Sequence, residues 1–263
     1  MHHPRKRFGQ HFLHDHNILR KIIRGIRLSP LDRMVEIGPG QGALTRFLLE
    51  TLAHLDAVEL DHDLVRYLRE KFFSQQLTVH AGDALRFDFD ALWRASGTNH
   101  QKLRIVGNLP YNISTPLLFH LFSQLHCIED MHFMLQKEVV SRLTAKTGEP
   151  AYGRLSIMAQ YFCDTEALFT VSANAFTPPP KVASAIIRLT PKKQLSLNQS
   201  EFSVFCDIVK EAFNYRRKKL SNSLKRFVTQ DQLVTLKIDP NNRPEALSMG
   251  EYIRIARAIS VDS

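Results

Sequence analysis

The feature that most constrains the fold is an alternation of short apolar runs with helix-length periodic segments between residues 32 and 189. We expect strands at residues 33–38, 55–60, 77–82, 103–108, 131–136, 167–171 and 183–189. We expect helices at residues 43–52, 63–72, 114–125 and 154–162. Continuous apolar strands separated by helices are typical of a parallel sheet covered on both faces. The sequence therefore predicts a doubly wound, Rossmann-like α/β fold.

The pattern changes after residue 190, where a linker-like stretch is followed by sequence without strand-like runs. Residues 202–215, 216–228 and 248–259 have helical character. Ser248 and Glu251 have the spacing of a capping box, which marks the start of the last helix. We therefore predict a sheet domain over residues 1–190 and a small all-helical domain over residues 191–263.

Composition narrows the class of protein. Hydrophobic residues make up 44% of the chain and charged residues 23%, as in ordinary globular proteins. The longest apolar runs are far too short to cross a bilayer, and no apolar signal segment follows the basic residues at the N-terminus. We expect a cytoplasmic protein with no membrane partner.

Cysteine and histidine usage bears on redox state and metals. Cys127, Cys163 and Cys206 are widely spaced and odd in number, so they fit neither a disulfide framework nor a paired metal motif. We expect buried or incidental thiols. Three histidines lie within residues 11–16, but no cysteine or spaced carboxylate completes a zinc-like ligand set around them. We expect no metal.

Three predicted strand tips carry residues suited to a nucleoside. Glycines 38, 40 and 42 follow the first strand, where they let the backbone approach a ligand beside a helix N-terminus. Glu59 ends the second strand, where a carboxylate can hydrogen-bond a ribose diol, and Asp83 follows the third, where it can accept from an adenine amine. Each carboxylate taken alone could be a solvated loop residue. Because the glycine turn has no basic residue for a pyrophosphate, S-adenosylmethionine fits better than NAD.

The fourth predicted strand delivers Asn108-Leu109-Pro110-Tyr111 to the same edge. These four residues suit methylation of a planar amine on a base, whose lone pair is delocalised into the ring. The Asn108 oxygen and a backbone carbonyl, that of Leu109, can accept the two N–H bonds and aim the lone pair at a methyl donor. Pro110 would fix the turn, and Tyr111 would stack on the flipped base.

Several motifs together resemble one family. They are "GQHFL" (9–13), "EIGPGQG" (36–42), "VELD" (58–61), "GDA" (82–84), "GNLPYNIST" (107–115), "FTPPPKVASAIIRL" (176–189) and "EAFNYRRKKLSNSL" (211–224). In this order they are similar to the small-subunit (16S) ribosomal RNA adenine N6,N6-dimethyltransferases of the KsgA type, over nearly the whole chain.

The resemblance implies transfer of two methyl groups from S-adenosylmethionine to each of two adjacent adenines near the 3′ end of small-subunit rRNA, during ribosome biogenesis. Residues 1–190 would then be the methyltransferase domain and residues 191–263 a helical RNA-binding domain. The implied partner is the rRNA of a pre-30S particle, and we expect a monomer. Carried over by position, the cofactor-binding residues are His11, Leu13, Gly38, Gly40, Glu59, Asp83 and Asn108.

The same resemblance implies roles at the target base. Asn108, Leu109 and Tyr111 would hold the amine, and Phe176 would stack on the base from its other side. An aromatic residue before "TPPPK" could instead anchor a rigid loop. Position 11 is usually Asn in the family's "GQNFL" and is His here.

A basic run supports an RNA partner. Lys and Arg total 35 against 26 acidic residues, a net charge of +9, which favours phosphate-rich partners. Residues 214–227 contain six basic residues and no acidic one. On a helix, Phe213, Leu220, Leu224 and Phe227 would share one face and the basic residues would project outward. The predicted RNA-binding residues are Arg5, Lys6, Arg7, Arg216, Arg217, Lys218, Lys219, Lys225 and Arg226.

Two other functions remain open from the residues. Related N-P-P-Y and D-P-P-Y tetrads serve methylation of DNA adenine and protein glutamine, but Leu109 replaces the first Pro here. A non-catalytic RNA-binding or ribosome-assembly protein could also keep this fold, although it would have less need of Glu59, Asp83 and the tetrad together.

Overall fold

The computed structural model describes residues 11–95, 101–215 and 217–261, and the chain divides into two compact units. The first unit contains Met1–Val140 and Glu166–Pro191, and the second contains Ser141–Thr165 and Lys192–Ser263. The predicted domains do not coincide with these units. The predicted boundary near residue 190 is close to the point after Pro191 where the chain passes from the first unit to the second. Residues 141–165, however, belong to the second unit together with the C-terminal part of the chain.

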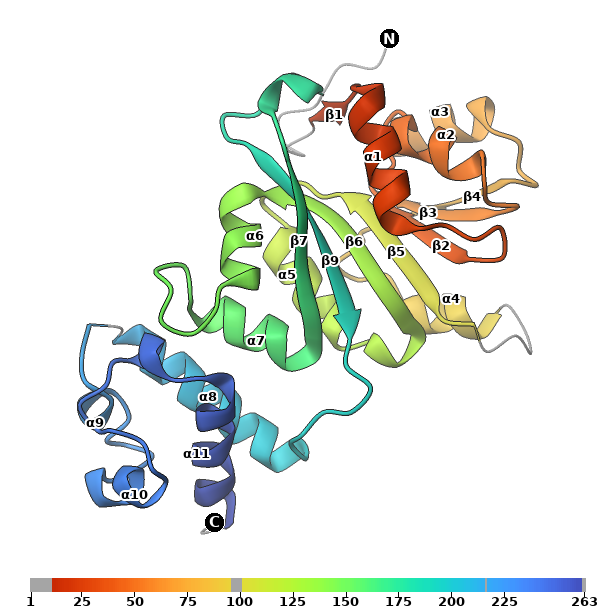
Figure 1. The fold of residues 1–263 in the computed structure, drawn as a ribbon. Coiled ribbons are helices and arrows are strands. Elements are labelled where there is room, and N and C mark those ends of the chain that lie inside the picture. The colour runs from red at the N-terminus through yellow and green to blue at the C-terminus, as the bar shows by residue number, and fades with distance from the viewer. Residues whose placement is uncertain (1–10, 96–100, 216, 262–263) are drawn as a thin grey trace. The chain divides into compact units, whose positions relative to one another are not determined.

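A seven-stranded sheet is the centre of the first unit (Figure 1). In sheet order its strands are β4 (Leu77–Ala81), β3 (Leu55–Glu59), β2 (Arg33–Ile37), β5 (Leu103–Asn108), β6 (Ile128–Gln136), β9 (Ser184–Pro191) and β7 (Cys163–Val171). The pairs from β4 to β6 are parallel, and β9 runs antiparallel to β6. The seven predicted strands are all present, and the predicted doubly wound α/β fold is confirmed.

The helices of the first unit connect these strands. They are α1 (His16–Ile26), α2 (Ala43–Leu49), α3 (His62–Lys71), α4 (Phe89–Ala95) and α5 (Ser114–Phe122). Figure 1 shows α1 in front of the strands and α5 behind them. Val35, Ile105 and Phe133 on central strands are fully buried, because the sheet is covered on both faces.

The register brings the strand tips together. Ile37 of β2 pairs with Val58 of β3 and with Gly107 of β5, and Glu59 of β3 pairs with Ala81 of β4. Four parallel strands therefore end at one edge, which is where ligands bind in open α/β sheets. A short two-stranded sheet, β1 (Phe12–Leu13) with β8 (Phe176–Thr177), was not predicted.

The second unit contains α7 (Arg154–Phe162), α8 (Gln199–Asn214), α9 (Leu220–Ser223), α10 (Gln230–Thr235) and α11 (Met249–Val261), and α6 (Lys137–Thr144) begins in the first unit. Tyr161 of α7 stacks on Phe202 of α8, with ring centroids 5.1 Å apart. Tyr152 donates a hydrogen bond to the Leu247 carbonyl at 3.0 Å. These contacts explain why residues 141–165 belong to this unit. Beyond residue 191 the described chain is helical and contains no strand.

The predicted helix over residues 216–228 is wrong, since among residues 217–228, which the structure describes, only those of α9 are α-helical. After α8 the Lys218 N–H donates to the Tyr215 carbonyl in a turn. The N–H groups of Leu220 and Ser221 then donate to the carbonyls of Asn242 and Pro240, so a neighbouring loop fixes the path of the chain. None of the described helices combines the length and hydropathy needed to cross a membrane.

Candidate active site

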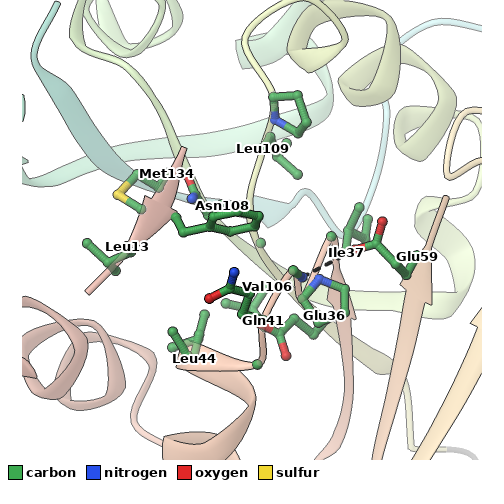
Figure 2. A pocket seen from close by; sticks show the side chains of 18 of the residues that line it. Leu13, Glu36, Ile37, Gln41, Leu44, Glu59, Val106, Asn108, Leu109 and Met134 are labelled. Atoms are coloured by element: carbon green, nitrogen blue, oxygen red, sulfur yellow. Dashed lines mark hydrogen bonds between the residues drawn. The ribbon is translucent and has the colours of Figure 1, made fainter. Parts of the chain in front are cut away.

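A cavity of about 680 Å³ opens at the carboxyl ends of β2, β3, β4 and β5 in the first unit (Figure 2). Ten of the residues predicted for the site line it. They are His11, Leu13, Gly38, Gly40, Glu59, Asp83, Asn108, Leu109, Pro110 and Tyr111. Sequence motifs that are far apart along the chain therefore meet in one place.

The glycine turn after β2 needs its glycines. Gly38, Gly40 and Gly42 have φ values of 67°, 58° and 77°, a region that disfavours residues with a Cβ. A Cβ on Gly42 would lie 2.7 Å from the Phe72 ring, and one on Gly40 would lie 3.0 Å from the Phe12 ring. The turn thus brings bare backbone to the cavity wall.

Two buried carboxyl groups lie under this turn. Glu59 accepts the Gly40 N–H at 3.2 Å and the Asp61 N–H at 2.9 Å, and burial raises its pKa. Glu36 accepts the Thr45 hydroxyl at 2.6 Å, and burial raises its pKa to about 8. Glu59 therefore links the tip of β3 to the glycine turn, while Glu36 is a neutral carboxyl at pH 7.

Asp83, in the loop after β4, uses one carboxylate oxygen to accept the Leu85 N–H at 2.9 Å. Its other oxygen has no hydrogen-bond partner in the part of the chain that the structure describes. Asp83 is partly exposed and lines the cavity, so this oxygen can accept from a ligand.

The orientation of the Asn108 amide is set by the backbone. Its Nδ2 donates to the carbonyl of His11 at 2.9 Å. With the nitrogen held there, the Oδ1 atom is left as the acceptor at the cavity, where Figure 2 shows Asn108 beside Leu109 and Met134. No described residue donates to the Leu109 carbonyl, so a second acceptor lies next to the first.

The His11 side chain contacts residues of two other sequence motifs, Pro178 and Tyr111. Its ring Nδ1 donates to the Pro178 carbonyl at 2.7 Å, since a carbonyl can only accept. The ring also stacks on Tyr111, with centroids 5.8 Å apart and 30° between the planes. Tyr111 is half-buried and its hydroxyl lies 2.8 Å from the Ser184 hydroxyl. The pKa of Tyr111 is raised, because the effect of burial is larger than the opposing effect of the hydrogen bond with Ser184.

Phe176 lies in the short sheet that β8 forms with β1. It pairs with Leu13 across the short β1–β8 sheet, is only 2% exposed and belongs to the hydrophobic core. It is not among the residues that line the cavity. In this structure the position fits the alternative in which the aromatic anchors the Pro-rich loop, and the stacking role of Phe176 stays a prediction.

Five of the nine predicted RNA-binding residues are described, and all five are exposed on the second unit. They are Arg217, Lys218, Lys219, Lys225 and Arg226. Leu220 and Leu224 are fully buried between them, so the expected division into apolar and basic sides holds without the long helix. Arg5, Lys6, Arg7 and Arg216 lie outside the described residues.

Some lining residues were missed from the sequence. Leu60 and Ala84 line the cavity directly after the two strand-tip acidic positions, and Leu19 and Ile22 of α1 line it from another side. The sequence does contain a pattern from which helix α1 could have been predicted. Asp15 accepts the N–H groups of Asn17 and Ile18 as an N-cap, and apolar residues follow with helical spacing.

One group of described residues has metal-ligand chemistry, namely Asp90, His126 and Cys127. Its arrangement is explained by other contacts. Arg94 lies 2.7 Å from Asp90, which opposes a cation, and burial raises the pKa of the Cys127 thiol to about 11. Cys127 and Cys163 are buried free thiols and Cys206 is partly buried.

Comparison with known proteins agrees with this geometry. The model of the ribosomal RNA adenine dimethylase family matches residues 1–260. Ribosomal RNA small subunit methyltransferase A of Coxiella burnetii (strain RSA 493 / Nine Mile phase I) is 53% identical over 257 residues, which cover 97% of this chain and 98% of the relative. The protein of the same name from Pseudomonas syringae pv. syringae (strain B728a) is 52% identical over 260 residues, covering 98% and 96%.

Two solved structures are also similar. A dimethyladenosine transferase from Plasmodium falciparum has a TM-score of 0.78 and 26% identity, covering 93% of this chain and 96% of that one. The 23S rRNA methyltransferase ErmE has a TM-score of 0.74 and 23% identity, covering 94% and 99%, a likeness of fold alone.

Proposed function

Because this chain belongs to the ribosomal RNA adenine dimethylase family, we propose that it transfers two methyl groups to each of two adjacent adenines near the 3′ end of small-subunit rRNA. The chain is an rRNA adenine dimethyltransferase, and S-adenosylmethionine is its methyl donor. The observation that carries the proposed mechanism is the Asn108 amide, whose nitrogen is held by the His11 carbonyl and whose oxygen is left to accept.

The residues of the cavity fit the donor. S-adenosylmethionine, when bound, supplies a methyl group on a positively charged sulfur. In our proposal Glu59 accepts from the ribose hydroxyls and Asp83 accepts from the adenine amine with its second carboxylate oxygen. A Cβ added to Gly82 would meet nothing within 4 Å, so there is open space beside Asp83. Gly38 and Gly40 allow close approach, and Leu13 contributes an apolar wall.

Asn108 and Leu109 would orient the target amine. The exocyclic nitrogen of adenine is a poor nucleophile because its lone pair is delocalised into the ring. Two acceptors, Asn108 Oδ1 and the Leu109 carbonyl, would hold the two N–H bonds and favour a pyramidal nitrogen. No general base is required, since the nitrogen becomes acidic as it is alkylated and then loses a proton readily. Tyr111 would stack on the flipped base, a contact worth about 1 to 3 kcal/mol.

The finer features of the substrate are proposals of the same kind. The exposed basic residues of the second unit, Arg217 to Lys219 with Lys225 and Arg226, would contact rRNA phosphates. Arg5, Lys6, Arg7 and Arg216 would add to them. We further propose that the substrate is a pre-30S particle, that the enzyme acts as a monomer, and that it works in the cytoplasm.

The first test is methyl transfer to small subunits that lack the modification. Wild-type protein with labelled donor should label the rRNA and block reverse transcription at two adjacent adenines. Asn108→Ala should lower turnover by at least about 100-fold, as loss of one preorganised hydrogen-bonding group does elsewhere, while RNA binding is retained.

Asn174→Ala is the matched control, because Asn174 is exposed in the first unit and does not line the cavity. It should leave turnover unchanged. Unlabelled rRNA with intact donor binding would overturn the proposed function, and wild-type turnover by Asn108→Ala would remove Asn108 from its role.

A further inference from the structure

A second basic surface lies on the first unit, apart from the run at residues 217–226. Helix α1 exposes Arg20, Lys21 and Arg24, and Arg46 of the adjacent helix α2 is exposed next to it. The sequence of α1, HNILRKIIRGI, contains no acidic residue. We call these four side chains the α1–α2 basic face.

Two of the four side chains share one aromatic ring. Arg46 Cζ lies 5.2 Å and Arg20 Cζ lies 6.0 Å from the centroid of the Phe47 ring, and the His16 ring contacts it edge-on at 5.6 Å. The ring attracts each guanidinium group, but the two like charges still repel each other, and an anion bound between them would offset that repulsion. No carboxylate of the described chain forms an ion pair with Arg20, Lys21, Arg24 or Arg46.

The charges are not explained by the needs of helix α1. Basic residues often stabilise the last turn of a helix by binding its free carbonyl groups. Here that role is filled from the sheet, since Arg104 donates to the Ile26 carbonyl at 2.7 Å and Arg188 donates to the Gly25 carbonyl at 2.6 Å. A face that only kept the protein in solution would mix signs, as α3 does with Asp63 and Glu70 among its basic residues.

The basic face starts at the rim of the cavity. His16 and Arg46 are exposed and also line the cavity that contains Asn108. An adenine can reach Asn108 only after leaving its stack, so the phosphates on either side of it remain outside. Positive side chains around the opening are suited to those phosphates by charge, and the planar guanidinium fork is suited to them by shape.

We propose that the α1–α2 basic face binds the RNA backbone that flanks the target adenine, with Arg20 and Arg46 as the central phosphate contacts. This inference rests on the proposed function, because it takes rRNA as the substrate. It adds a contact surface on the unit that carries the cavity, distinct from the basic run of the second unit.

The test is the salt dependence of RNA binding. The dissociation constant for an unmodified small-subunit rRNA fragment is measured by fluorescence anisotropy over a series of KCl concentrations. Removal of one phosphate-binding charge should lower the slope of log K against log salt by roughly 0.7 to 0.9, so Arg20→Gln with Arg46→Gln should lower it by roughly 1.4 to 1.8. Arg20→Gln alone should give about half of this change, and Arg20 does not line the cavity.

Two controls separate charge from packing and from general effects. Arg20→Lys with Arg46→Lys keeps both charges but alters the cation–π contacts with Phe47, and it should keep the wild-type slope. Arg66→Gln removes one exposed charge on α3, among acidic neighbours and outside the cavity lining, and it should leave the slope unchanged.

A wild-type slope in both Gln variants would overturn the inference, as would an equal decrease of the slope in the Lys pair. Failure of the proposed function gives a different result. In that case the wild-type protein does not label rRNA, whatever the salt slope of the variants.

Discussion

At the scale of single residues, Asn108 is held by the main chain and not by another side chain. The partner is the His11 carbonyl, at 2.9 Å. A backbone contact does not depend on which side chain stands at position 11, so His in place of the family's usual Asn is compatible with the same amide orientation. The His11 ring is then available for its own interactions with Pro178 and Tyr111.

Glu36 leads to a prediction about pH. Burial raises its pKa from 4.5 to about 8. A carboxyl whose pKa is raised by folding is protonated in the native state and ionised in the unfolded state between these values, so stability is lost as pH rises from 4.5 to about 8. Glu36→Gln keeps the neutral shape and removes this loss. Its free energy of unfolding, relative to wild type, should rise by up to about 5 kcal/mol over that range.

Urea denaturation of both proteins at several pH values between 4.5 and 8 checks this. Because all other titrating groups are shared, the difference between the two curves isolates Glu36. Parallel curves would mean that Glu36 is ionised in the folded protein.

At the scale of elements, helix α1 is fastened at its C-terminal end by the sheet. Arg104 of β5 bonds the Ile26 carbonyl and forms an ion pair with Asp130 at 2.7 Å and another with Asp32, all with side chains no more than 15% exposed. Arg188 of β9 bonds the Gly25 carbonyl. Since Leu19 and Ile22 of α1 line the cavity, these arginines also hold one of its walls.

Arg104→Met should therefore affect both stability and the cavity. It leaves two largely buried carboxylates without their partner, a change that typically costs about 3 to 5 kcal/mol. Donor affinity should fall as well, because the wall formed by α1 loosens. Thermal unfolding and calorimetric titration of the donor measure the two effects. Arg94→Met, which removes an ion pair whose arginine is 71% exposed, should change neither. Unaltered donor affinity in Arg104→Met would show that α1 does not need this anchor.

Elements were predictable from the sequence where burial leaves a clear pattern. The strands β2 to β5 are short runs with several buried apolar residues each, and they were found within a residue of their ends. The two-residue strands β1 and β8 have no such pattern, because they pair only with each other. The run after Arg216 has helical spacing at Leu220 and Leu224, yet bonds from Leu220 and Ser221 to the loop at residues 240–242 decide its path. The local spacing of apolar residues does not reveal hydrogen bonds to a segment that is distant along the chain, so the helix was predicted wrongly.

The candidate active site, too, was predictable from the sequence only in part. Residues at strand tips, such as Glu59 and Asn108, were predictable because parallel strands end at one edge. For Phe176 the motif gives the residue but not its burial, which leaves it 2% exposed in this structure, so its stacking role stays a prediction. The Arg20 and Arg46 pair was also hidden, because it depends on two helices meeting at Phe47.

At the scale of the whole molecule, the chain passes between its two compact units at residues 140–141, 165–166 and 191–192. Removal of residues 191–263 would therefore divide the second unit. Tyr161 of α7, now 3% exposed and packed on Phe202 and Phe205, would lose those partners. We expect this truncated chain to aggregate or to bind a hydrophobic dye such as ANS, whereas the full chain does not. A soluble truncated protein with native thermal unfolding would contradict this expectation.

Because the chain passes between its two units three times, the choice of junctions in chimeras with related proteins is restricted. An exchange of C-terminal segments between relatives, with one junction near residue 191, would pair a foreign α8 with the resident α7. The aromatic contacts within the second unit would then have to match across parental sequences. Chimeras should succeed more often when residues 141–165 and the segment after residue 191 come from the same parent. The second unit would then be inherited as two stretches of sequence transferred together.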